Sequence, residues 1–286
     1  MKWEGDRQSD NVEDRRGGGG GGFGGLGGKS VGIGTLVIAL IGSAFFGIDP
    51  SVFLGGGGEP VPVQQGPAAA PANDRETQFV KTTLAYTEDV WAQIFKEQGA
   101  QYQPARLVLF EQATNTACGT GRSASGPFYC PADQQVYIDL SFFRLMQQRF
   151  KVEGEFAQAY VIAHEVGHHV QTLLGVSGQV HTAQQRASQK EGNALSVRME
   201  LQADCFAGVW ANRTNKREQI LEAGDVEAAL AAATAIGDDA LQRQSQGQVV
   251  PDSFTHGSSA QRVRWFRRGL DSGQVEQCNT FDARQL

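Results

Sequence analysis

Two histidines and a glutamate occur at a spacing that suits a metal ion. His164, Glu165 and His168 form the pattern H-E-x-x-H within the run V-I-A-H-E-V-G-H-H-V. On an α-helix, side chains four residues apart lie on the same face, so both imidazoles can bind one cation. Glu165 then lies about 100° around the helix, where it can act on a metal-bound water without being a ligand. The pattern predicts one zinc ion per chain, with Glu165 as the general base.

A catalytic zinc site needs a third protein ligand and an open position for water. The longer pattern H-E-x-x-H-x-x-G-x-x-H is excluded, because Gln171 and Leu174 occupy its last two defining positions. Glu200 and Asp204 lie four residues apart on the next segment with a helical pattern. We expect Glu200 to bind the metal and Asp204 to accept the free ring N–H of a ligating histidine, His164.

The four cysteines are too widely spaced for a Cys₄ zinc ribbon, which requires close C-x-x-C pairs. In an oxidising compartment they can form two disulfides. Proximity predicts a bond between Cys118 and Cys130, and elimination then pairs Cys205 with Cys278. The alternative is a set of unpaired buried cysteines.

The N-terminal quarter of the chain has an uneven composition. Residues 1–29 are polar and then glycine-rich, which predicts a disordered tail. Residues 30–48 are predicted to form a single transmembrane helix, because residues 31–48 carry no charge. A cleaved signal peptide is the alternative, but the polar segment before it is long and no clear cleavage site follows. Residues 49–73 are expected to be a Gly/Pro/Ala linker, and residues 74–286 the globular domain.

The distribution of charge predicts how the chain is oriented in the membrane, and the net charge excludes nucleic acid as a partner. The positive residues near the apolar run precede it, and the next one is Arg75. The positive-inside rule therefore predicts a cytoplasmic N-terminus and a domain on the periplasmic or extracellular side. The net charge of −6 gives no basic surplus of the kind that nucleic-acid binding needs.

The periodicity of residues 74–286 predicts a mainly helical α+β domain. Two segments rich in branched and aromatic residues, 106–110 and 135–140, are expected to be antiparallel strands joined by a loop that holds Cys118 and Cys130. The helical patterns cover residues 76–97, 141–149, 153–174, 194–210, 224–236 and 259–269. Residues 176–193 are polar and are expected to form a surface helix or loop that shields the site.

Several stretches together resemble one bacterial family. These are H-E-V-G-H-H, M-E-L-Q-A-D-C-F-A-G, G-P-F-Y-C-P-A-D-Q followed by V-Y-I-D-L, and T-H-G-S-S-A-Q-R-V. They are similar to the family called "putative neutral zinc metallopeptidases", and the similarity extends from the N-terminal M-K-W-E-G to the C-terminus. The motif order also resembles the gluzincins, whose third ligand is a glutamate followed four residues later by Asp. The resemblance implies a zincin-like fold and a membrane-anchored zinc peptidase.

The resulting hypothesis is hydrolysis of a peptide or protein, with zinc held by His164, His168 and Glu200. His256 could donate to the developing oxyanion, although a turn-forming histidine beside Gly257 explains that residue nearly as well. The substrate is expected to lie along the strand at residues 135–140. Two alternatives stay open: a non-catalytic membrane-tethered module with structural zinc, and a zinc amidase acting on cell-wall peptide. The sequence does not indicate the oligomeric state.

Overall fold

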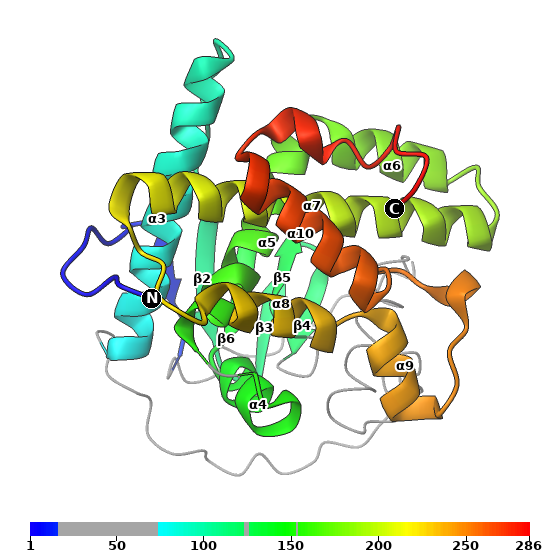
Figure 1. The fold of residues 1–286 in the computed structure, drawn as a ribbon, viewed down its shortest axis with the longest axis horizontal. Coiled ribbons are helices and arrows are strands. Elements are labelled where there is room, and N and C mark those ends of the chain that lie inside the picture. The colour runs from blue at the N-terminus through cyan, green and yellow to red at the C-terminus, as the bar shows by residue number, and fades with distance from the viewer. Residues whose placement is uncertain (17–73, 123–125, 153) are drawn as a thin grey trace.

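The computed structural model describes residues 1–16, 74–122, 126–152 and 154–286. The fold is α+β and mainly helical, as predicted, with the main helices packed on one face of a small sheet (Figure 1). The helices are α3 (Arg75–Glu97), α4 (Ser141–Phe150), α5 (Glu155–Leu173), α6 (Val176–Gln184), α7 (Gln189–Glu218), α8 (Asp225–Ala235), α9 (Asp238–Gln246) and α10 (Ser259–Ser272), with short 3-10 helices at Pro251–Ser253 and Val275–Cys278.

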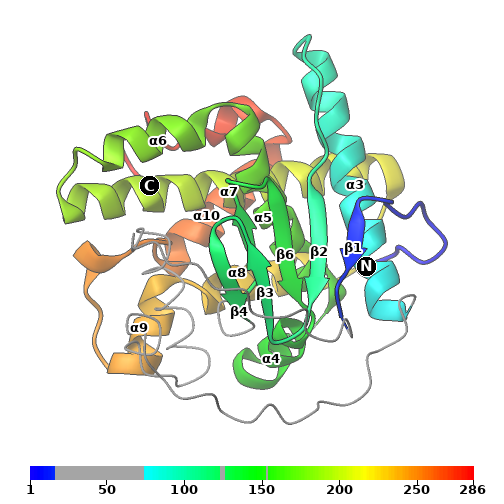
Figure 2. The same ribbon diagram turned by 180° about the vertical axis from the view of Figure 1, so that it is seen from behind.

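The sheet has the strand order β1 (Val12–Asp14), β2 (Arg106–Phe110), β6 (Gln135–Asp139) and β5 (Phe128–Cys130). Alternate residues of β2 face opposite sides, as expected for a strand. Leu107 and Leu109 join the main core with the helices, whereas Val108 and Phe110 join a smaller cluster on the other face. Figure 2 shows the sheet from this other side, together with the hairpin of β3 (Ala113–Thr116) and β4 (Gly119–Arg122).

Two predictions about the strands were wrong. Strands β2 and β6 are parallel, not antiparallel, because the segment between them is long enough to cross over and also contains the β3–β4 hairpin and β5. Strand β6 is also not available to a substrate, since its backbone pairs with β2 on one side and β5 on the other. The edge of the sheet on this side is β5.

The predicted helices are present, with shifted ends and one addition. Helix α7 begins five residues before the expected position, because Ser188 and Glu191 form a capping box that fixes its start. The segment expected to be a surface helix or loop consists of α6 and the first turn of α7. Helix α9 was not predicted, since it is short and polar.

Helices α7 and α10 cross with their backbones in contact. A Cβ atom on Gly208 would lie 2.1 Å from the carbonyl oxygen of Phe266, and one on Gly269 would lie 1.9 Å from that of Cys205. Only glycine fits at these two positions, so the crossing is fixed by sequence. The disulfide between Cys205 and Cys278 closes the same region. The second predicted disulfide, Cys118–Cys130, joins the β3–β4 turn to β5.

Residues 1–16 are not a disordered tail, which corrects part of the prediction for residues 1–29. Strand β1 pairs in parallel with β2, and Trp3 is 4 % exposed. Ser9 and Asn11 donate hydrogen bonds to the buried Glu88 of α3. The composition of the whole segment suggested disorder, but the specific partners of its first residues order it on the domain.

The other N-terminal predictions, namely the remainder of the tail at residues 17–29, the transmembrane helix at residues 30–48 and the linker at residues 49–73, lie outside the described residues. Within the part of the chain that the structure describes, no helix has the length and apolar character needed to cross a membrane.

Candidate metal centre

Helix α5 presents His164, Glu165 and His168 from its buried central turns. The side of α5 that faces the core carries Ile162, Val166 and Val170, all fully buried. This apolar side holds the helix in the interior together with the polar side chains of the H-E-x-x-H motif. A Cβ atom on Gly167 would lie only 3.1 to 3.3 Å from atoms of Ala203. These small residues let α5 and α7 approach closely, and so bring the H-E-x-x-H motif next to Glu200.

The three predicted ligands lie together. Nε2 of His164 is 3.1 Å from Oε2 of Glu200, and Nε2 of His168 is 3.4 Å from Oε1 of Glu200. One ligand atom from each of the three residues lies within 4.8 Å of the others. With zinc-to-ligand distances of about 2.0–2.1 Å, tetrahedral geometry separates neighbouring ligand atoms by about 3.3 Å. The donor set and its spacing therefore fit zinc.

Both histidines are held through the other ring nitrogen. Nδ1 of His164 lies 2.9 Å from Oδ1 of Asp204, the partner that the sequence predicted. Nδ1 of His168 lies 2.8 Å from Oε1 of Gln171, whose amide donates to the backbone oxygen of Met199 on α7. Acceptors at Nδ1 fix the tautomer that leaves Nε2 free to bind a metal. From the sequence, Gln171 was interpreted only as a mismatch with the glycine of the longer pattern H-E-x-x-H-x-x-G-x-x-H. Its position three residues after His168 nevertheless puts it on the same face of the helix.

Asp204 accepts three hydrogen bonds from two residues besides His164. Tyr160 donates its hydroxyl at 2.6 Å, and Arg262 donates from Nε and Nη2 at 2.9 Å to the two carboxylate oxygens. Arg262 and Asp204 are both buried. Arg262 and Asp204 thus form an internal ion pair. Tyr160 had no recognisable signal, because its partner is 44 residues away in the chain.

The two glutamates of the centre have opposite pKa shifts. Burial raises the pKa of Glu165 above its usual value. Burial acts in the same direction on Glu200, but the charge of His168 and hydrogen bonds from both histidines hold its pKa well below the usual value. Two carboxyl groups with pKa values pushed apart suit different tasks. Glu200 stays ionised, as a ligand must, and Glu165 can accept and return a proton.

The surroundings of the ligating histidines favour positive charge in the centre. Burial lowers the pKa of His164, but the charge and hydrogen bond of Asp204 outweigh burial and raise the pKa to about 10. The carboxylates around these imidazoles therefore stabilise a cation in the centre, whether it is a proton or a metal ion.

His256 lies beside this cluster. Its ring Nδ1 is 3.2 Å from Oδ1 of Asp238, and the backbone N–H groups of His256 and Gly257 donate to Oδ2 of Asp238 at 2.6 and 2.9 Å. Burial lowers the pKa of His256, whereas Asp238 and the charge of Glu200 raise it above its usual value. Asp238 is at the start of α9, the helix that was not predicted, so this pair was not anticipated.

The remaining histidines lie outside the centre. His169 accepts and donates through its two ring nitrogens: Nδ1 is 3.2 Å from the hydroxyl of Tyr129, and Nε2 is 2.7 Å from the backbone oxygen of Gln103. It therefore connects α5 to strand β5. His181 is exposed on α6.

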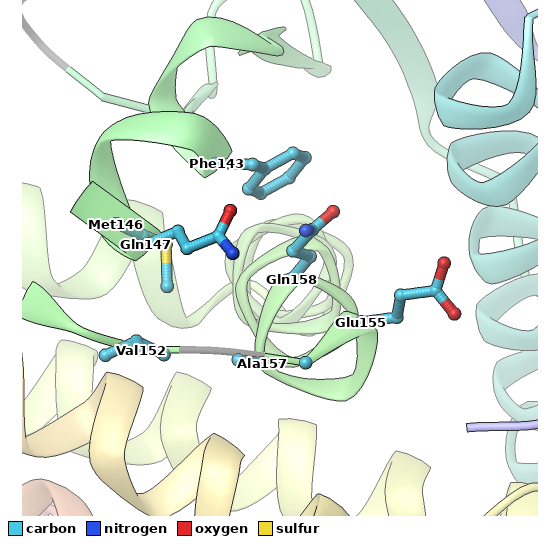
Figure 3. Close-up of a pocket in the computed structure, with 8 residues that line it drawn as sticks. Phe143, Met146, Gln147, Val152, Glu155, Ala157 and Gln158 are labelled. Atoms are coloured by element: carbon cyan, nitrogen blue, oxygen red, sulfur yellow. The ribbon is translucent and has the colours of Figure 1, made fainter.

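A hollow in the surface lies between α4 and the start of α5 (Figure 3). Its labelled lining residues are Phe143, Met146, Gln147, Val152, Glu155, Ala157 and Gln158. The first turn of α5 contributes to it, whereas His164 and His168 are on later turns. This hollow is separate from the metal centre.

Comparisons with known proteins agree with this geometry. Residues 1–281 match a family model described as "Putative neutral zinc metallopeptidase". The chain is 53% identical over 288 residues to "Uncharacterized protein YpfJ" of Escherichia coli strain K12, covering 98% of this chain and 99% of that protein. It is 43% identical over 218 residues to "Uncharacterized protein Mb2605" of Mycobacterium bovis, covering 73% of each. None of the solved structures matches the chain.

Proposed function

The chain belongs to the family described as "Putative neutral zinc metallopeptidase", and we propose that it hydrolyses peptide bonds with one zinc ion held by His164, His168 and Glu200. The observation that carries this proposal is the position of Glu165. It is buried next to the three ligand side chains, but it is not one of them, and its pKa is raised. A purely structural zinc site has no use for such a carboxylate and would be closed by a fourth ligand.

The residues divide the chemistry between them. Zinc, when bound, supplies a Lewis acid that activates water and polarises the carbonyl of the peptide. Glu165 takes the proton of the attacking water and later returns it to the leaving amine. His256, oriented by Asp238 through Nδ1, donates from Nε2 to the oxygen that becomes negative. Asp204 and Gln171 hold the two ligating imidazoles in place.

We expect the substrate to be a peptide or a protein segment in an extended conformation. Strand β5 is at the edge of the sheet and contacts α5, so it replaces β6 as the strand along which a peptide would lie. The hydroxyl of Tyr129 on β5, hydrogen-bonded to His169, keeps this edge in register with the metal helix.

The proposed location is an oxidising compartment outside the cytoplasm. The two disulfides support this, because such bonds rarely persist in a reducing cytoplasm. An anchor at residues 30–48 stays a prediction for residues that the structure does not describe, and the pairing of β1 with β2 argues against the single crossing that the sequence predicted. A cell-wall amide is the alternative substrate, since the same metal chemistry would hydrolyse it.

The test uses purified protein and a library of quenched fluorescent peptides, with cell-wall peptides as a second substrate. We expect about one zinc per chain, and loss of cleavage after chelation. Glu165→Gln should keep the zinc and lose turnover by several orders of magnitude, whereas Glu227→Gln, at an exposed position on α8, should match the wild type. A wild-type chain without zinc, or a fully active Glu165→Gln variant, would overturn the proposal.

A further inference from the structure

We propose that Arg262 is a positioning residue of the metal centre, which holds Asp204 in the orientation that fixes His164 for zinc. This inference rests on the proposed zinc site and adds a residue from a different helix to it. Arg262 is on α10, 58 residues from Asp204 along the chain and 98 from His164.

The contact between Arg262 and Asp204 is a two-point contact. Nε binds Oδ2 and Nη2 binds Oδ1, both at 2.9 Å. Because a guanidinium is planar and its N–H groups have fixed directions, such a fork sets the rotation of the carboxylate as well as its position. Oδ1 is thereby aimed at Nδ1 of His164, at 2.9 Å.

Burial makes the pair interdependent. Arg262 is 2 % exposed and Asp204 is fully buried. A carboxylate in such a place is costly without a cation, and a protonated or rotated Asp204 would be a weaker acceptor for the imidazole N–H. Arg262 supplies the cation without competing for the metal, since a guanidinium has no acceptor atom.

The arginine is itself held from several sides. Its Nη2 lies 3.2 Å from the hydroxyl of Tyr160 on α5, and its Nη1 lies 3.4 Å from the backbone oxygen of Ile236 after α8. A capping box of Ser258 and Gln261 fixes the start of α10 just before it. The Gly208–Gly269 crossing then sets the depth at which α10 lies against α7. Side chains of α5 and α10 thus meet the Asp204 carboxylate of α7 behind His164, and the residue that follows α8 helps to hold Arg262.

The experiment measures zinc affinity in competition with a chromophoric chelator, and the absorption spectrum of the cobalt-substituted protein. Arg262→Gln should weaken zinc binding by about 10- to 100-fold, as loss of such outer partners typically does, and should alter the cobalt spectrum. Arg262→Lys, which restores the charge but not the fork, should lie between Arg262→Gln and wild type. Arg267→Gln, at an exposed position on the same helix, should bind zinc as the wild type does.

Two further variants separate positioning from general support of the fold. Asn212→Ala removes a 2.6 Å bond to the backbone oxygen of Leu270, another tie between α7 and α10, and should lower stability without changing zinc affinity. Arg262→Gln combined with Asp204→Asn removes both buried charges. If Arg262 acts through Asp204, the double variant binds zinc as well as Asp204→Asn alone.

The outcomes are distinct. Wild-type affinity in both Arg262 variants, or an Arg262→Gln effect that adds in full to that of Asp204→Asn, would overturn the role of Arg262. If Arg262→Gln does not fold, Arg262→Lys and the double variant decide. Failure of the wild type to bind zinc would overturn the proposed function instead.

Discussion

Trp3 donates its indole N–H to Glu155 at 2.8 Å, so the third residue of the chain is fastened to the first turn of the helix that carries the H-E-x-x-H motif. The ring packs edge to face against Phe79 of α3, with centroids 5.4 Å apart, and lies under the guanidinium of Arg75. The N-terminal segment is therefore part of the framework that holds the metal helix.

This contact predicts a large effect on stability. Trp3→Ala removes a buried ring and should lower the free energy of unfolding by about 3–5 kcal/mol. Trp3→Phe keeps most of the packing and loses one hydrogen bond, so it should cost about 1–3 kcal/mol. Glu155 loses the partner of Oε2 but keeps its ion pair with Arg75 through Oε1. Urea unfolding measures both, with the exposed Asp10→Ala as the control. Equal unfolding midpoints for Trp3→Ala and wild type would mean that residues 1–16 are not docked.

A second prediction concerns the stability of the fold at acidic pH. Arg16 bridges Asp14 at 2.7 Å and Asp74, the cap of α3, at 3.2 Å. Burial raises the pKa of both carboxyl groups, but hydrogen bonds and the Arg16 charge outweigh it and hold the pKa of each below the ordinary 3.8. A depressed pKa stabilises the folded state above the unfolded value, and the gain is lost as the pH falls.

The difference in unfolding free energy between wild type and Arg16→Gln should therefore be constant at neutral pH and shrink as the pH falls through 3.8. Urea titrations at a series of pH values measure this. A difference that grows on acidification would contradict the assignment.

The docked N-terminus also bears on membrane topology. A chain that crossed a membrane once between residues 16 and 74 would place its two flanks on opposite sides, whereas β1 pairs with β2 in one sheet. This contact argues against a single crossing. Cysteines introduced at the exposed positions Asp10 and Glu227 should react alike with a membrane-impermeant maleimide in intact cells. Labelling at position 227 alone would support the predicted cytoplasmic N-terminus with an outside domain.

The sequence predicted the local part of the site and not the long-range part. His164 and His168, and Glu200 and Asp204, are pairs four residues apart on helices, so periodicity alone puts each pair on one face. The partners Arg262 and Asp238 come from segments whose approach depends on tertiary packing, including the glycine crossing of α7 and α10.

The errors in the predicted fold have a similar origin. Strand β1 is three residues long and pairs with a strand more than ninety residues later, and no local pattern indicates such a partner. The direction of β6 relative to β2 depends on how the connecting segment crosses, which the spacing of the strands left open.

The His256–Asp238 pair predicts a defect in turnover without loss of metal. His256→Gln should lower kcat by about 10²–10³, the usual cost of losing an oxyanion donor, while zinc affinity stays at the wild-type level. Asp238→Asn should have a smaller effect on kcat, because the His256 imidazole is still present and loses only the carboxylate that orients it. Kinetics on the preferred peptide and metal analysis test this, with the exposed His181→Gln as the control. Unchanged kcat in His256→Gln would assign the residue to the turn beside Gly257.

The last prediction separates the two acidic residues of α7. Glu200 approaches Nε2 of both ligating histidines. Of these imidazole nitrogens, Asp204 approaches Nδ1 of His164, which faces away from the metal. Glu200→Ala therefore leaves two ligands and should abolish stable zinc binding. Asp204→Asn keeps all three ligands and should bind zinc about 10- to 100-fold more weakly.

Both variants are loaded with excess zinc, dialysed and analysed for metal. We expect Asp204→Asn to retain zinc when the dialysis buffer contains it and Glu200→Ala to lose it under the same conditions. Glu191→Ala, at the exposed start of the same helix, controls for general effects on α7. The reverse ranking would exchange the assigned roles, because only a residue that touches the metal can be indispensable when zinc is in excess.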